Sequence, residues 1–334
     1  MFLHYNHYIV TFWAFIILFS TVHAQNTSRQ FPLSGKIIVL DPGHGGTAAT
    51  DSYRQGPSGE REEWINLRVG LLLKDLLETK GATVLMTRTN DVAIPLADRA
   101  KLAADNKADL LVSVHHNATA DSSVNFPIIY FHGTASENQA GVAFAKLLAE
   151  RFVERLFQSG TPVSIVSDHT IFPEAGAGVL RRSYGIPGVI AEASFFTNPV
   201  EEERLKRKDH NSNEAAAYAE AIEIFFRRPI PAIFPKDTLN FPPKFQSLQE
   251  SERMSPAALL WKQNFEEGET LMDARDTATI QKAYDLFTQS AKSFPDSYLA
   301  GTCHRYRAIL LKKMGRAGDA AYEEKRVKEF YPAW

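Results

Sequence analysis

The chain has 334 residues, a length that predicts about two domains. Its composition, 44% hydrophobic and 23% charged, is that of a globular protein, and its net charge of −2 gives no electrostatic basis for binding nucleic acid. A single cysteine, Cys303, excludes an intrachain disulfide and a cysteine-rich zinc site.

Residues 1–24 are predicted to be a signal peptide. The mostly apolar run from Tyr8 to Phe19 is shorter than the roughly 20 residues that a membrane span needs. Val22-His23-Ala24 fits a cleavage site, so we expect a mature protein that starts at Gln25, keeps no stable membrane span and is exported to the periplasm or the extracellular space. Because the amino end has no Lys or Arg, an uncleaved membrane anchor is the alternative. Residues 25–35 form a polar lead.

The first predicted strand, from Lys36 to Asp41, runs into the turn Asp41-Pro42-Gly43-His44-Gly45-Gly46. Pro42 fixes its own φ, and the glycines permit backbone shapes that side chains would block. His44 is therefore held on a stiff turn at the carboxyl end of a strand, where open α/β sheets bind ligands. A glycine turn that happens to contain a histidine is the alternative.

A helix is predicted to open at Glu60-Arg61-Glu62-Glu63, because leucines recur behind it at helical spacing. Acidic residues in a first turn complement the helix dipole, which alone would explain these glutamates. A strand over residues 82–87 and a helix over residues 95–107 follow. The resulting βαβα order predicts an α/β fold, a mostly parallel twisted sheet with helices on both faces.

The third predicted strand, residues 109–114, ends in His115-His116-Asn117. Successive side chains of a strand point to opposite faces, so at most one of the two histidines is expected to face a given site. A fourth strand over residues 126–131 and an amphipathic helix over residues 136–157 are predicted next.

Glu192 interrupts another apolar strand, residues 188–194. A lone carboxylate in such a strand is costly unless it is paired. Either Arg181 or Arg182 neutralises Glu192 in a salt bridge, or Glu192 faces a metal or a substrate.

The last part of the chain differs in composition. Prolines recur through residues 229–256, which predicts an extended linker. Residues 257–334 are predicted to form three or four amphipathic helices, a small all-α domain that weakly resembles a tetratricopeptide-type array. These helices either cap the preceding domain or dock a partner. Since few contacts are expected across a proline linker, a chain ending near Arg228 is expected to fold and to keep its activity.

Four stretches together resemble the zinc-dependent N-acetylmuramoyl-L-alanine amidases of the amidase-3 type. The resemblance covers residues 36–227, within a catalytic domain expected over residues 36–228. The stretches agree with the family in order, in residue type and in their place at strand ends: Asp41-Pro42-Gly43-His44-Gly45-Gly46, Glu62 with Asn66-Leu67, Ser113-Val114-His115-His116-Asn117-Ala118, and Ala191-Glu192 followed by Phe195, Thr197, Asn198 and Pro199.

The resemblance implies one Zn²⁺ per chain, bound by His44, Glu62 and His115, with Glu192 as the catalytic glutamate. Glu62 is selected because the family's ligand glutamate usually lies five residues before the leucine matched here by Leu67, and Glu63 is the alternative. Two positions depart from the common pattern, His116, where a small residue is usual, and Ala191, where a larger aliphatic residue is usual. Neither departure removes a ligand.

The implied activity is hydrolysis of the amide bond between the lactyl group of N-acetylmuramic acid and the L-alanine of the stem peptide in peptidoglycan. Two imidazoles and one carboxylate leave zinc an open position for water, and a nearby carboxylate can move its proton. A zinc peptidase is the second hypothesis, with Arg181 or Arg182 binding a C-terminal carboxylate. A non-catalytic wall-binding protein is the third.

Overall fold

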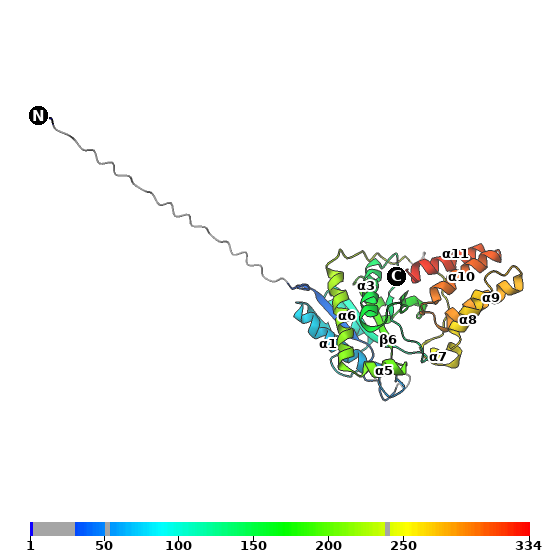
Figure 1. The fold of residues 1–334 in the computed structure, drawn as a ribbon, viewed down its shortest axis with the longest axis horizontal. Helices are drawn as coiled ribbons and strands as arrows, with labels where there is room; N and C mark the ends of the chain where they lie inside the picture. Colours follow the sequence, from blue (N-terminus) through cyan, green and yellow to red (C-terminus); the bar gives the residue numbers. More distant parts are fainter. Residues whose placement is uncertain (3–30, 51–53, 238–240) are drawn as a thin grey trace. The chain divides into compact units, whose positions relative to one another are not determined.

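The computed structural model describes residues 1–2, 31–50, 54–237 and 241–334 (Figure 1). Apart from Met1 and Phe2, the predicted signal peptide lies outside the described residues. Residues 31–334 belong to one unit, which contains both the predicted catalytic domain and the C-terminal helices. None of the helices in the described residues is long and apolar enough to cross a membrane.

Six strands form one sheet in the order β2-β1-β3-β6-β4-β5. Four of them, β2, β1, β3 and β6, run parallel, whereas β4 pairs with β6 in the antiparallel direction and with β5 in parallel. The mostly parallel sheet expected from the βαβα order is therefore confirmed. The strands are β1 (Ile37–Pro42), β2 (Thr83–Met86), β3 (Leu110–Asn117), β4 (Ile128–Phe131), β5 (Ser164–Ser167) and β6 (Gly188–Phe195).

The helices before residue 229 connect the strands and flank the sheet. They are α1 (Glu62–Thr79), α2 (Leu96–Asp105), α3 (Gln139–Leu156), α4 (Gly178–Arg182), α5 (Pro199–Leu205) and α6 (Lys208–Phe226), with a 3₁₀ turn, η1 (Asp168–Thr170). The carboxyl end of β3 runs through Asn117, beyond its predicted end, because His115 and Asn117 continue the pairing with β6, with a register shift between them.

The alternation of side chains along the strands builds two separate cores. Leu110, Val112 and Val114 of β3 pack with residues of α1, α3 and α6 on one face of the sheet. Leu111 of β3 packs with Ala103 of α2 and with α4 on the opposite face. Helices therefore cover both faces, as the sequence pattern predicts.

Four helices follow the proline-rich segment and gather at one side of the ribbon (Figure 1). The elements of this region are α7 (Glu250–Arg253), η3 (Pro256–Ala258), α8 (Trp261–Thr270), α9 (Thr277–Ser293), α10 (Ala300–Lys313) and α11 (Ala317–Phe330). The four long helices match the three or four that were predicted. Neighbouring helices of this series pack on one another, as in a helical array.

The C-terminal helices also complete the core of the sheet. Trp261 and Phe294 pack in one buried cluster with Ile128 and Tyr130 of β4 and with Phe195 of β6. A buried aromatic cluster of this kind stabilises by several kcal/mol. This packing argues against the expectation that a chain ending near Arg228 folds like the whole protein.

Candidate metal centre

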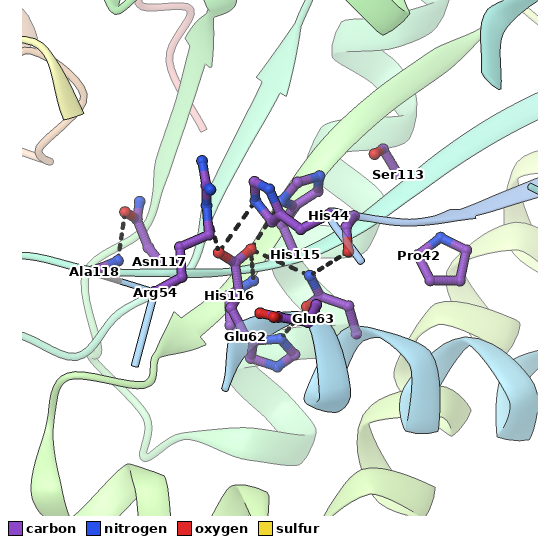
Figure 2. Close-up of polar contacts among 12 residues, drawn as sticks. Pro42, His44, Arg54, Glu62, Glu63, Ser113, His115, His116, Asn117 and Ala118 are labelled. Atoms are coloured by element: carbon purple, nitrogen blue, oxygen red, sulfur yellow. Dashed lines mark hydrogen bonds and ion pairs between the residues drawn. The ribbon is translucent and has the colours of Figure 1, made fainter. Parts of the chain in front are cut away.

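Three side chains from separate segments meet at the carboxyl edge of β1 and β3. His44 follows β1, Glu62 lies in the first turn of α1, and His115 lies near the end of β3. His44 Nε2 is 3.1 Å from Glu62 Oε2, and His115 Nδ1 is 2.9 Å from Glu62 Oε1. The two imidazole rings converge on the carboxylate (Figure 2), with their centroids 4.8 Å apart. The structure therefore brings the three predicted ligands together.

The geometry of this group suits a zinc ion. Ligand atoms bound to zinc at about 2.1 Å in a tetrahedron lie roughly 3.4 Å from one another, close to the distances between the carboxylate and the imidazoles. Burial raises the pKa of Glu62, but the two imidazoles lower it, and the net effect is a pKa well below the usual value. A lowered pKa favours the ionised carboxylate, which is the form that binds a metal. Three protein donors leave a fourth position open.

The turn that carries His44 is held in an uncommon conformation. His44 has φ = 57°, in the left-handed region that non-glycine residues seldom adopt. Arg99 Nη2 donates a hydrogen bond of 2.6 Å to the carbonyl oxygen of His44, which fixes the peptide. Gly43 is required for a second reason, because a Cβ atom there would lie 2.1 Å from Cε1 of His115. Strained turns of this kind cost roughly 1–3 kcal/mol and cluster at functional sites.

Asp41 anchors the arginine that holds this turn. Its Oδ1 accepts hydrogen bonds of 2.7 Å from Arg99 Nη1 and from Thr87 Oγ1, and its Oδ2 accepts one of 2.7 Å from Ser113 Oγ. Burial raises the pKa of Asp41, but Arg99 and the two hydroxyls lower it, to a net value below the usual one. Asp41 therefore joins β1 to α2 through Arg99 and to β3 through Ser113, and it also binds Thr87, the residue after β2.

The structure separates the two candidate glutamates. Glu63 Oε1 accepts a hydrogen bond of 2.7 Å from Arg61 Nε and another from Thr47 Oγ1. Glu62 is the one that contacts both His44 and His115 (Figure 2). This placement supports Glu62 as the ligand.

His116 and His115 point to opposite sides of β3, as the alternation predicts. His116 Nδ1 lies 2.9 Å from Asn66 Oδ1, and its Nε2 lies 3.1 Å from Glu214 Oε2, with all three side chains buried. Asn66 Nδ2 in turn donates to Glu62 Oε1 at 3.2 Å. His116, which departs from the pattern that the sequence resembles, thus contacts Asn66, which in turn holds the carboxylate of Glu62, a role that the sequence did not indicate.

Glu192 lies on β6, directly beside His115 in the parallel register of β3 and β6. Both residues line a cavity of about 810 Å³, together with His44 and Glu62. Arg181 and Arg182 also line this cavity, and their guanidinium groups donate to the carbonyl oxygens of residues 175, 176 and 178. The cavity is therefore lined by the predicted catalytic glutamate and by all three predicted metal ligands.

Several cavity residues were not predicted. Arg54 lies 3.8 Å from Glu62, measured from Nε to Oε2, and Tyr130 of β4 and Arg253 of α7 also line the cavity. No sequence pattern indicated Arg253, because it lies in the proline-rich segment that was predicted to be a linker. A further group of two histidines and a carboxylate, His132, Asp168 and His169, also has the composition of a metal site.

Residues 38–224 match the Amidase_3 family, described as N-acetylmuramoyl-L-alanine amidase. The chain is 31% identical over 204 residues to the "Probable cell wall amidase LytH" of Staphylococcus aureus. That match covers 61% of this chain and 62% of the relative, so it spans less than two thirds of the relative's length.

Solved structures show the same fold. The N-acetylmuramoyl-L-alanine amidase AmiC2 of Nostoc punctiforme superposes with a TM-score of 0.50 and 25% identity, covering 58% of this chain and 99% of that one. An N-acetylmuramoyl-L-alanine amidase from Clostridium difficile 630 gives the same TM-score and identity, covering 57% of this chain and 97% of that one. In both cases nearly the whole solved chain corresponds to little more than half of this one.

Proposed function

This chain belongs to the N-acetylmuramoyl-L-alanine amidase family, and on that premise we propose that it hydrolyses the amide bond between the lactyl group of N-acetylmuramic acid and the L-alanine of the stem peptide in bacterial peptidoglycan. The observation that carries the proposal is the convergence of His44, Glu62 and His115 in a cavity that Glu192 also lines. A cavity of about 810 Å³ has room for a glycopeptide fragment around the scissile bond.

His44, Glu62 and His115 hold one Zn²⁺ per chain in this proposal. When bound there, zinc would lower the pKa of a water molecule and polarise the scissile carbonyl group. The protein keeps the donors in place through Asn66, which donates to Glu62, and through Arg99, which fixes the backbone of His44. Glu63 stays outside the ligand set, because its carboxylate is bound to Arg61.

Glu192 is the general base and then the general acid. Its carboxylate accepts the proton that the attacking water loses, and the same group passes that proton to the nitrogen of the leaving alanine. Its position in β6 beside His115 supports this role, because the two residues occupy paired positions of neighbouring strands. General acid–base catalysis of this kind contributes roughly 10²–10⁴-fold to a rate.

Digestion of purified peptidoglycan tests the reaction itself. The expected product is a peptide with a new free amino group on L-alanine, together with an intact glycan strand. A new carboxyl or amino group elsewhere in the peptide would replace the proposal with the zinc peptidase. Binding to peptidoglycan with no new terminus would replace it with the non-catalytic wall-binding protein.

Glu192→Gln tests the assignment of the base. The variant keeps the shape of the side chain, so we expect near-normal zinc content and melting temperature with activity lower by roughly 10²–10⁴-fold. A salt bridge whose only role is structural predicts the opposite, a loss of about 3–5 kcal/mol of stability with near-normal turnover of the folded fraction.

We further propose an exported protein that acts in the periplasm or outside the cell, because peptidoglycan lies there. Cleavage after residue 24 and the division into residues 36–228, 229–256 and 257–334 remain predictions, as does a protein or cell-wall partner for the C-terminal helices. Amino-terminal sequencing of the secreted protein would test the cleavage site, and a mature chain that still begins at Met1 would favour the membrane anchor.

A further inference from the structure

The segment from Ser247 to Arg253 lies against the catalytic part of the chain. Ser247 Oγ donates 3.2 Å to the carbonyl oxygen of Thr170, and the amide of Ala120 donates 3.0 Å to the carbonyl oxygen of Arg253. Leu248, Gln249 and Arg253 line the same cavity as the metal ligands. A segment beyond the family match, which ends at residue 224, thus supplies one wall of the catalytic cavity.

Arg253 is the buried cation of this wall. Its side chain is 6% exposed, Nη1 lies 3.1 Å from Asp296 Oδ2, and the guanidinium lies over the ring of Phe294 at 5.1 Å. Burial lowers the pKa of Arg253, but Asp296, Tyr130 and Glu192 raise it, to a net value above the usual one. The guanidinium therefore stays charged beside the cavity.

One edge of this guanidinium is unused. Nη1 contacts Asp296, and the hydroxyl group of Tyr130 also lies close to the guanidinium, but Nε and Nη2 are buried and make no hydrogen bond of ordinary geometry among the described residues. Nε and Nη2 form the parallel pair of N–H donors that matches the two oxygens of a carboxylate. Buried donors without a partner are rare in folded proteins and cost roughly 1–3 kcal/mol, so a group that satisfies them on binding gains that energy.

We propose that Arg253 is a substrate-binding residue, whose Nε–Nη2 edge binds a carboxylate of the stem peptide beyond the alanine of the scissile bond. The inference rests on the proposed amidase function and adds a specificity determinant to it. The substrate class that it selects is a muropeptide with an ionised carboxylate close to the cleaved amide, in preference to the same peptide with that carboxylate amidated. Asp296 and Phe294, from the C-terminal region, hold the guanidinium in place.

The experiment compares two soluble muropeptides, one with free and one with amidated peptide carboxylates, in the full-length zinc-loaded enzyme. Arg253→Lys keeps a positive charge beside Asp296 but lacks the paired donors. We expect kcat/KM for the free carboxylate to fall roughly 10- to 100-fold, mainly through KM, and the preference over the amidated peptide to disappear.

Arg307→Lys is the matched control. Arg307 is also buried in the C-terminal helices, paired with Glu323 at 2.8 Å and placed over the ring of Tyr284 at 4.5 Å, but it does not belong to the described lining of the cavity. This variant should keep the wild-type ratio of the two kcat/KM values. An Arg253→Lys protein that folds, binds zinc and keeps the same ratio would overturn the inference.

The wild-type protein separates the possible failures. If it cleaves neither muropeptide at the lactyl–alanine bond, the proposed function is wrong. If it cleaves both with equal kcat/KM, the amidase assignment stands and the carboxylate site is wrong, even where Arg253→Lys does not fold.

Discussion

Two clusters in the described part of this chain have the same donor set, two histidines and one carboxylate, but different surroundings. The first cluster, His44, Glu62 and His115, lines a cavity. His44 follows β1, Glu62 lies in α1 and His115 lies in β3. His132, Asp168 and His169 lie under the C-terminal region, where Phe241 and Phe330 pack against the ring of His169. All three residues of the first group line the cavity, whereas the described lining includes Asp168 alone from the second group, and aromatic side chains from elsewhere in the chain cover His169.

The second cluster is partly occupied: His132 and one oxygen of Asp168 bind other groups, whereas His169 Nδ1 and Asp168 Oδ1 have no hydrogen-bond partner among the described residues. Lys236 Nζ lies 2.5 Å from His132 Nε2, so that nitrogen accepts from the lysine while Nδ1 donates to Asp168 Oδ2 at 2.7 Å. The amide of Ala177 donates to the same carboxylate oxygen at 2.7 Å. The lysine supplies the positive charge that a metal would supply. Residue types alone therefore do not define a metal site, because the cations and N–H groups around them decide whether an ion can bind.

The largest effect is expected from loss of a ligand in the open cluster. His44→Ala, Glu62→Ala and His115→Ala should each lose zinc and activity together, because a three-ligand site tolerates no missing donor. Elemental analysis and turnover on peptidoglycan measure the two quantities.

Matched controls come from the neighbouring glutamate and from the covered cluster. Glu63→Gln and His132→Gln should keep one zinc per folded chain, because Glu63 is bound to Arg61 and His132 to Lys236. If Glu63→Gln loses zinc while Glu62→Ala keeps one zinc per chain, Glu63 rather than Glu62 is the ligand.

The open cluster could be predicted because each of its residues lies in a local pattern. His44 follows an apolar strand through a proline–glycine turn, Glu62 opens a helix with leucines at regular spacing, and His115 ends a strand. The carboxyl ends of parallel strands meet at one edge of a sheet, which indicated a shared site for His44 and His115. The choice of Glu62 and of the three-residue ligand set came from the family resemblance, because the local pattern alone left these glutamates as residues that complement a helix dipole.

The covered cluster and the wall of the cavity could not be predicted in this way. Lys236 and Arg253 lie in the proline-rich segment, whose composition predicts an extended chain but says nothing about what the chain lies against. The contacts of Arg253 with Asp296, and of Lys236 with His132, join residues distant in the sequence. Pairing over such distances leaves no periodic pattern.

Removal of residues 229–334 is expected to have the next largest effect. It would keep the predicted metal ligands in the chain but would uncover His169 of the second cluster, together with Ile128, Tyr130 and Phe195. Exposing these side chains costs about 1.5–3 kcal/mol each, a large share of the roughly 5–15 kcal/mol that stabilises a domain. We expect a chain ending at Arg228 to be largely insoluble, measured as soluble yield and melting temperature. A soluble, fully active chain would show that the C-terminal helices are an independent domain.

Lys236→Ala is expected to change the covered cluster more modestly. Without the ammonium group, His132 Nε2 loses its donor, and the carboxylate of Asp168 loses a nearby positive charge. We therefore expect a second, weaker zinc per chain at high zinc concentration, measured by titration against a competing chelator, with wild-type affinity at the first site. A stoichiometry that stays at one would show that the packing around His169, rather than the lysine, excludes the ion.

The smallest effect expected is a dependence of stability on pH that originates at His169. Burial, helped by the neighbouring His132 and Lys236, lowers the pKa of His169 to about 4, against an ordinary value of 6.5. Between pH 6.5 and pH 4 the unfolded chain therefore binds a proton that the folded chain does not, so stability falls as the pH falls through this window. The loss from this one residue is about 2 kcal/mol between pH 7 and pH 5. The glutamine of His169→Gln cannot be protonated, so the urea-unfolding midpoint of this variant should fall less over the same interval. His304 and the predicted zinc ligands contribute equally to both proteins, so their effects cancel in the comparison. Equal shifts in the two proteins would mean that His169 takes up its proton in the folded state and that the covered cluster is more open to water than its packing indicates.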